Sequence, residues 1–274
     1  MNQLFNFKRF GRFLYWDFVQ HIRSYARLTG GLCIALCALS AFAVLCSFQD
    51  LRTVPDDWLA YELNGYLSLL GGGCLFVVLL VHVLRASKTF APQKTKQQYI
   101  NFMMQPSTTL EKYVGRLLSV GLISLLSGLI AVVAADLLHF LLSLVFIRRP
   151  MGSVTMYFFG GIVDAFEVRS SFPGTIMFCV GAWLYLYSTY VLGSALFNRN
   201  PMLWTTLVDF AVWMVLVPSV GFICSPLLQN GVWYNLEVPS VLIAAVWLLL
   251  VLNHVLAYRI FTRRQVVCHG LISL

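Results

Sequence analysis

The sequence predicts an all-α membrane protein whose helices cross the bilayer six times. Hydrophobic residues make up 59% of the chain and charged residues only 11%. Soluble domains carry about 25% charged residues, so this chain has too few charges to cover a surface that faces water. The apolar runs are continuous rather than alternating, which favours a bundle of helices over a membrane β-barrel.

Six apolar runs reach the length of about 20 residues that a spanning helix needs. The expected spans are Leu28–Phe48, Gly65–Ala86, Leu117–Ile147, Thr175–Phe197, Leu203–Cys224 and Ser240–Ile260. The third run would be about 46 Å long as one helix, whereas the hydrocarbon core is about 30 Å thick. We therefore expect this helix to tilt, protrude or break.

The spans divide the chain into three regions. Residues 1–27 form an N-terminal segment, residues 28–260 form the transmembrane domain, and residues 261–274 form a tail. Most of the 19 lysines and arginines lie in the N-terminal segment, in the loop over residues 87–116 and in the tail. Because positive charge collects on the cytoplasmic side of a membrane, both termini and this loop are expected in the cytoplasm.

The N-terminal segment has the pattern of a basic amphipathic helix. Its apolar residues recur at steps of three and four; they are Phe7, Phe10, Leu14, Phe18, Ile22 and Tyr25. Lys8, Arg9, Arg12, Arg23 and Arg27 supply positive charge. Such a helix lies in the membrane interface, and we expect the chain to turn from it into the first span.

The second cytoplasmic loop, residues 87–116, combines a short apolar helix with a signal for a new helix. Residues 97–104 can form the short helix, and Pro106 ends it. Thr108 and Glu111 have the spacing of a capping box, which starts the helix leading into the third span. An exposed cluster of methionine and aromatic side chains indicates either a protein partner or contact with lipid.

Three ionisable residues lie within or beside the apolar runs. Asp136 and His139 are one turn apart, so they could share a proton or bind a metal, although they are expected near the outer interface. Asp209 lies about 9 Å inside the fifth span. Contact with a partner or a hydrogen bond to a neighbouring helix is the favoured role for Asp209, and proton relay is the alternative. Asn200 and Pro201 are expected to start its helix.

Small residues recur along the third apolar run at steps of four, three and four. They are Ser124, Gly128, Ala131 and Ala135. This spacing places them on one helix face, where a second helix can approach closely.

Several chemistries lack their usual motifs. The chain contains no Walker-type phosphate loop and no H-E-x-x-H or G-x-S-x-G motif. Its seven cysteines form no C-x-x-C pair, so neither a zinc site nor a disulfide framework is indicated. The net charge of +8 is spread along the ends of the apolar runs, which argues against nucleic-acid binding. We expect no cofactor and no enzymatic activity.

The chain resembles the six-span permease subunits of type 2 bacterial ATP-binding-cassette exporters. The resemblance rests on the N-terminal helix around Phe7–Phe10, on six spans with both ends inside, and on the loop Phe102–Tyr113. Related permeases carry an apolar stretch, Leu-Pro, a small residue, Glu-Lys and an aromatic residue before the third span. This chain has Gln105 where the family usually has leucine.

The resemblance implies an exporter permease in the bacterial cytoplasmic membrane, paired with a second permease as a homodimer or heterodimer. A separate ATPase would dock under the second cytoplasmic loop, whose candidate contacts are Tyr99, Phe102, Met103, Met104, Glu111 and Lys112. Two other classes stay open: a membrane-embedded enzyme that uses Asp209, Asp136 or His139, and a scaffold or sensor that transports nothing.

Overall fold

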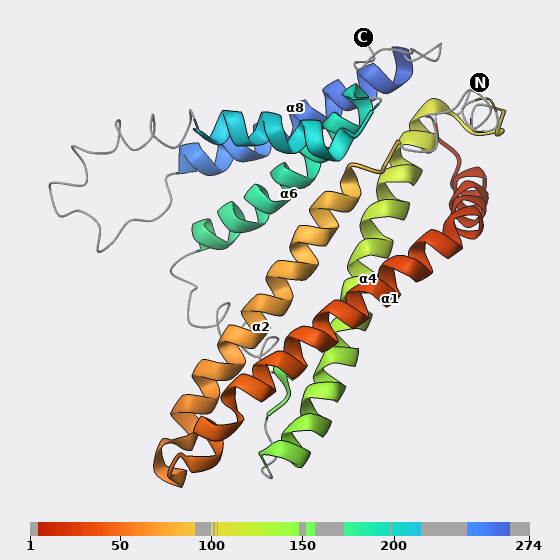
Figure 1. The fold of residues 1–274 in the computed structure, drawn as a ribbon. Helices are drawn as coiled ribbons and strands as arrows, with labels where there is room; N and C mark the ends of the chain where they lie inside the picture. Colours follow the sequence, from red (N-terminus) through yellow and green to blue (C-terminus); the bar gives the residue numbers. More distant parts are fainter. Residues whose placement is uncertain are drawn as a thin grey trace, which may run out of the picture. The chain divides into compact units, whose positions relative to one another are not determined.

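The structure is a computed structural model. It describes residues 5–90, 100, 102, 104–147, 152–156, 173–197, 199–214 and 240–263. Within these ranges the chain forms helices joined by turns, and no β-strand occurs among them (Figure 1). The predicted all-α class is therefore confirmed for the described part of the chain.

The helices are long, as the apolar runs predict. They are α1 (Phe7–Thr53), α2 (Asp56–Ala86), α4 (Thr109–Phe146), α6 (Pro173–Leu196) and α8 (Ser240–Arg263). Residues 201–214 form a further helical segment directly after Asn200, as expected from the Asn-Pro pair. Asn200 has a φ of 47°, a left-handed conformation that asparagine adopts more readily than most residues.

Five of these helices are long and apolar enough to cross a membrane. The candidate spans are Phe7–Ser47, Tyr61–Ala86, Thr109–Phe146, Ile176–Leu196 and Leu242–Arg263. By the length and apolar composition of these helices, the chain is a multi-pass membrane protein. The fifth expected span, Leu203–Cys224, is helical up to residue 214, and its second half lies outside the described residues.

The structure bears on two expectations about helix boundaries, the separate N-terminal helix and the three alternatives of tilting, protrusion or a break in the third apolar run. The amphipathic segment does not end in a separate helix near Arg27, because α1 continues from Phe7 through the first apolar run to Thr53. The third apolar run does not break either, since α4 is continuous over 38 residues. In both helices an amphipathic or capped start leads into the apolar part without interruption.

The chain divides into two compact units, and α1, α2 and α4 each contribute to both. Unit 1 comprises Met1–Asp17, Val83–Val120 and Phe172–Leu274, and unit 2 comprises Phe18–His82 and Gly121–Ser171. Each unit is described here by itself.

Unit 2 packs α4 closely against α2 through the predicted stripe of small residues. Ser124, Ala131 and Ala135 are at most 3% exposed. A Cβ atom on Gly128 would lie 2.5 Å from Val78, so glycine is needed where the two helices meet. Ala131 and Ala135 share a buried cluster with Leu67, Leu70, Cys74 and Val78. The predicted close approach at this face is confirmed.

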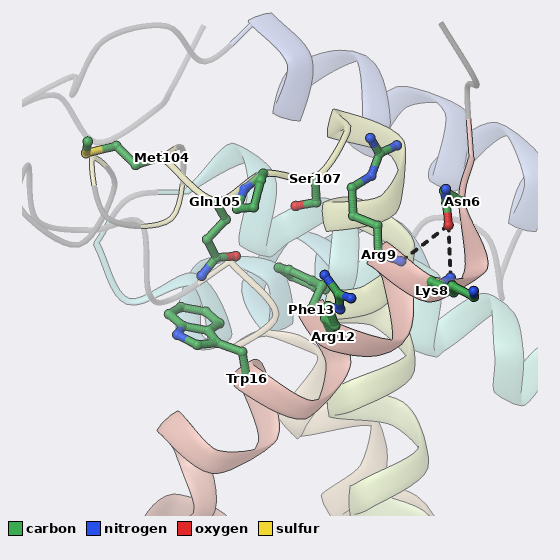
Figure 2. A pocket seen from close by; sticks show the side chains of 10 residues that line it. Asn6, Lys8, Arg9, Arg12, Phe13, Trp16, Met104, Gln105 and Ser107 are labelled. Atoms are coloured by element: carbon green, nitrogen blue, oxygen red, sulfur yellow. Dashed lines mark hydrogen bonds between the residues drawn. The ribbon is translucent and has the colours of Figure 1, made fainter.

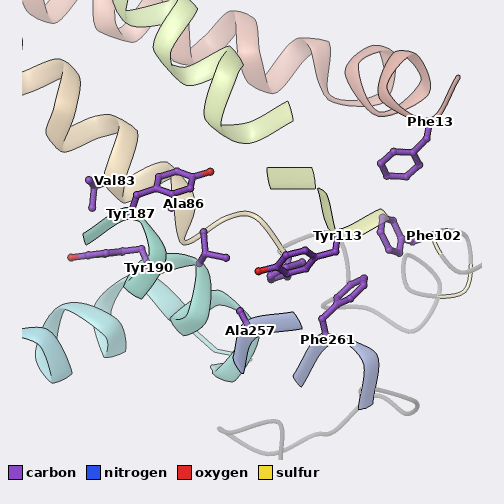
Figure 3. Packing of buried hydrophobic residues seen from close by; sticks show 12 residues of the cluster. Phe13, Val83, Ala86, Phe102, Tyr113, Tyr187, Tyr190, Ala257 and Phe261 are labelled. Atoms are coloured by element: carbon purple, nitrogen blue, oxygen red, sulfur yellow. The ribbon is translucent and has the colours of Figure 1, made fainter. Parts of the chain in front are cut away.

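Unit 1 is built around aromatic side chains from α1, α4, α6 and α8 and from the segments at Phe90 and Phe102 (Figure 3). Phe90 stacks on Tyr113 and on Phe261, with ring centroids 5.7 and 5.1 Å apart. Phe102 meets Phe13 and Phe261 edge to face. These contacts join the ends of α2 and α8 to the starts of α1 and α4.

Candidate functional site

The start of α4 is fixed by the capping box that the sequence predicts. The Thr108 backbone N–H donates to Glu111 Oε2 over 2.9 Å, and the Glu111 backbone N–H donates to Thr108 Oγ1 over 3.3 Å. Both halves of the box are formed, which satisfies two backbone donors that a helix start otherwise leaves open. The turn before α4 is thereby held in one conformation.

Glu111 also binds the start of α1. Arg9 donates from Nε to Oε2 and from Nη2 to Oε1, both over 2.7 Å, and the Asn6 backbone N–H donates to Oε1 over 2.7 Å. The fork of Arg9 matches the two carboxylate oxygens, which is the strong geometry for such a pair. The Glu111 side chain is fully buried, with four donors around its carboxylate.

Two further contacts join the same helices. The aromatic ring of Phe13 lies on Gly115, where a Cβ atom would come within 2.6 Å of the ring. One turn further along α1, Asp17 Oδ1 accepts a hydrogen bond from Arg116 Nη1 over 2.6 Å, and both side chains are buried. Arg116 Nε donates to the Thr89 carbonyl over 3.0 Å, which adds the end of α2 to the assembly.

We call this set of contacts the N-terminal clamp. It consists of Asn6 and Arg9 on Glu111, Phe13 on Gly115, and Asp17 on Arg116. Along both helices the order of these contacts is the same: the ion pair of Arg9 and Glu111 comes first, the packing of Phe13 on Gly115 second, and the ion pair of Asp17 and Arg116 third. The clamp therefore ties the first turns of α1 to the first turns of α4.

The turn between residues 104 and 107 projects from the clamp. Met104 is 79% exposed, and Pro106 and Ser107 follow it before the helix starts. An open pocket of about 770 Å³ lies between this turn and the first turns of α1 (Figure 2). The Met104 side chain is thus available to a partner on a turn whose position is fixed by Thr108 and Glu111.

The predicted docking residues fall into three groups. Met104 is exposed as expected. Phe102, Glu111 and Lys112 are at most 4% exposed, so the prediction that they offer surface contacts is wrong. Phe102 belongs to the aromatic core, and the Lys112 ammonium lies 5.6 Å above its ring. Tyr99 and Met103 lie outside the described residues.

Burial of Glu111 determines what its removal should do. A lost cap costs typically about 1 kcal/mol. Glu111→Ala would in addition leave Arg9 and the Asn6 N–H without the carboxylate that they bind. The substitution therefore disturbs the clamp itself and cannot serve as a surface test.

The three ionisable residues of the apolar runs have structural neighbours. Asp209 accepts a hydrogen bond from Thr189 Oγ1 of α6 over 3.1 Å, the interhelical bond that the sequence favours. Asp136 accepts from the Ser153 hydroxyl and from the Val154 and Thr155 N–H groups, so it caps the short helical turn at residues 154–156. His139 Nε2 lies 3.2 Å from the Tyr66 hydroxyl.

Among the described residues, Asp136 and His139 do not belong to a group of side chains that could hold a metal ion. Among the residues described, no group of three or more histidine, cysteine, aspartate or glutamate side chains is placed to hold a metal ion. Asp136 is occupied by three donors from residues 153–155. These contacts favour a packing role for both residues.

The clamp contains residues that sequence reasoning missed. Asp17 and Arg116 are absent from the predicted site, although a lone acidic residue in a basic amphipathic helix was a visible signal. Gly115 and Thr89 carry no sequence signal of their own.

Comparison with protein-family models, curated proteins and solved structures gives no match for this chain.

Proposed function

We propose that the chain is a membrane-spanning permease subunit of an ATP-driven exporter, energised by a separate ATPase that docks at the turn over residues 104–107. The observation that carries this proposal is an exposed Met104 on a turn that is rigidly joined to α4. A chain without a nucleotide site of its own needs a contact through which a partner can move its helices.

The clamp supplies the mechanical part of the proposal. Glu111 links the turn to α4 through the capping box and to α1 through Arg9. Both helices are candidate membrane spans. Displacement of Met104 by a partner would therefore act on two spans together, since coupling passes through contiguous packed and hydrogen-bonded contacts.

The same proposal includes the assembly and the compartment. A cleft for substrate would form between two permease copies, identical or different, in a bacterial cytoplasmic membrane. Both termini and the turn at Met104 would face the cytoplasm. An ATP-binding-cassette ATPase encoded beside this chain would be the expected partner, and the absence of one from the neighbouring reading frames would count against the proposal.

The central test is Met104→Asp, with Met104→Leu as the matched control. Met104 is 79% exposed, so neither change should affect folding. A buried anchor at an interface is worth roughly 2 kcal/mol or more, so the aspartate should weaken ATPase binding about thirtyfold. The leucine should preserve it. The measurements are pull-down of the ATPase and its permease-stimulated turnover.

Unchanged binding and turnover in Met104→Asp would remove this turn from the mechanism. Equal losses in both variants would also contradict the proposal, because leucine keeps the apolar contact. Normal elution of each variant from gel filtration in detergent establishes that the protein is intact in the comparison.

Membrane orientation can be tested separately with single cysteines in a background that lacks the seven native ones. Cysteines at Asp56 and Asp164 should react with an impermeant maleimide in intact cells, because these residues lie between expected spans on the side opposite to the basic loop over residues 87–116. A cysteine at Lys94 should react only after the membrane is opened. Labelling of position 94 in intact cells, with positions 56 and 164 protected, would reverse the orientation.

A further inference from the structure

The pocket beside the N-terminal clamp has the size of a ligand site. Its volume of about 770 Å³ falls in the range of roughly 300–1,000 Å³ that is common for bound small molecules. One wall is the first part of α1, including Lys8, Arg12 and Trp16, and the other is the turn with Gln105 and Ser107 (Figure 2). All of these residues belong to unit 1.

The pocket carries positive charge that the protein itself does not balance. Arg9 also lines it, but its guanidinium is paired with Glu111. Lys8 and Arg12 are exposed, and the structure records no ion pair for either of them among the described residues. Two cations on adjacent turns of one helix wall therefore remain available to an anion.

The opposite wall holds polar side-chain atoms that no described residue satisfies. Both Gln105 Nε2 and Gln105 Oε1, and also Ser107 Oγ, are inaccessible to solvent and lack a hydrogen-bond partner in that part of the chain. Figure 2 shows the Gln105 side chain extending toward Trp16. Unpaired buried polar atoms cost free energy. Gln105 and Ser107 line the pocket, so a rotation of their side chains into it would expose these atoms. A ligand that then accepts from Nε2 and Oγ and donates to Oε1 would recover this free energy.

The surface next to the cations indicates where this ligand comes from. Phe7 is 83% exposed and Tyr15 is 73% exposed. At about 100° per residue, these aromatic side chains lie on the helix face adjoining Lys8 and Arg12. An exposed aromatic face bordered by cations is typical of a helix in the membrane interface, with its cations at the level of lipid phosphates.

We propose that this pocket binds the headgroup of an acidic phospholipid. Lys8 and Arg12 bind the phosphate, Ser107 and Gln105 Nε2 donate to its oxygens, and Gln105 Oε1 accepts from a hydroxyl of the headgroup. The acyl chains extend over the face that carries Phe7 and Tyr15. A glycerol headgroup has both the phosphate and the hydroxyl groups.

The test titrates the full chain in detergent with phosphatidylglycerol, and in parallel with phosphatidylcholine of the same acyl chains, and measures bound lipid by native mass spectrometry. The double variant Lys8→Gln/Arg12→Gln should bind phosphatidylglycerol about tenfold more weakly, because each lysine or arginine near an anionic headgroup strengthens the electrostatic attraction to it. Arg23→Gln/Arg27→Gln removes two exposed cations of the same helix that do not line the pocket. It should keep the affinity.

Gln105→Leu tests the pocket independently of charge. The exchange removes only side-chain atoms that no described residue hydrogen-bonds, so the fold should be kept or slightly stabilised. Binding of phosphatidylglycerol should nevertheless fall several-fold, whereas binding of phosphatidylcholine should not change. A purely structural glutamine would leave both affinities unaltered.

Three results would overturn the proposal. One is an equal loss of affinity in the two double variants, which would indicate general attraction to the helix. Another is unchanged affinity in Lys8→Gln/Arg12→Gln and Gln105→Leu. The third is displacement of phosphatidylglycerol by glycerol 3-phosphate at equal concentration, which would assign the pocket to a soluble phosphate compound. The ATPase is not present in these titrations, so their outcome is independent of the transport proposal.

Discussion

Arg116→Ala should destabilise the protein by about 3–5 kcal/mol, because it removes one partner of a buried ion pair. Arg116 Nη1 lies 2.6 Å from Asp17 Oδ1, and the two side chains are 4% and 1% exposed. The alanine variant removes the guanidinium that balances the Asp17 charge and also the donor to the Thr89 carbonyl. We expect the clamp to open and the yield of intact protein in membranes to fall.

The measurement is the unfolding temperature of the purified protein in detergent, supported by gel filtration after heating. Arg23→Ala is the control, since Arg23 is exposed on α1, the helix that carries Asp17, and its loss should cost less than about 0.5 kcal/mol. Asp17→Leu/Arg116→Met should recover most of the stability, because apolar residues of similar volume often replace a buried pair without loss. Equal unfolding temperatures for Arg116→Ala and wild type would show that the Asp17–Arg116 pair contributes nothing to stability.

Gly193→Ala should have the second-largest effect on stability, about 1–3 kcal/mol, through overpacking. A Cβ atom on Gly193 of α6 would overlap Thr205 Oγ1 and lie 2.8 and 2.9 Å from Thr205 Cβ and Cγ2. Thr205 is 4% exposed, and its hydroxyl donates to the Pro201 carbonyl, so it has little room to move. The helical segment over residues 201–214 would be displaced from α6.

Gly72→Ala is the matched control for this variant. Gly72 is also a helical glycine, but a Cβ atom there would meet nothing within 4 Å. Alanine favours the helix over glycine by up to about 1 kcal/mol, so the control should be neutral or slightly stabilised. Thr205→Ala should partly rescue Gly193→Ala by removing Oγ1 and Cγ2. A Gly193→Ala protein as stable as the Gly72→Ala protein would contradict the close contact.

Local features of the structure could be read from the sequence because they depend on residues a few positions apart. The capping box of Thr108 and Glu111 spans three residues, and its two hydrogen bonds form inside one helical turn. The stripe of Ser124, Gly128, Ala131 and Ala135 follows from the period of the helix. The interhelical role of Asp209 could be favoured for a similar reason, since a carboxylate in an apolar helix requires a donor.

The exposure of Phe102 and Met104 could not be read in the same way. The sequence predicted Phe102 as part of an exposed cluster, yet it is 3% exposed against Phe13 and Phe261. Met104, two residues further on, is exposed as predicted. Composition and local pattern are similar for the two side chains. The difference arises from where α1 and α8 lie, which no local pattern specifies.

The sequence by itself determined the class of protein, the apolar helices and the way in which α4 begins, because hydropathy and capping act over one helix at a time. Only the tertiary structure decided which helices are tied together. Arg9 and Glu111 are 102 residues apart, and Asp17 and Arg116 are 99 residues apart. Helix periodicity states which residues share a face, but several basic residues were equally eligible partners for each carboxylate. The packing of Phe13 on Gly115 sets the register of α1 on α4, and this register selects the two pairs.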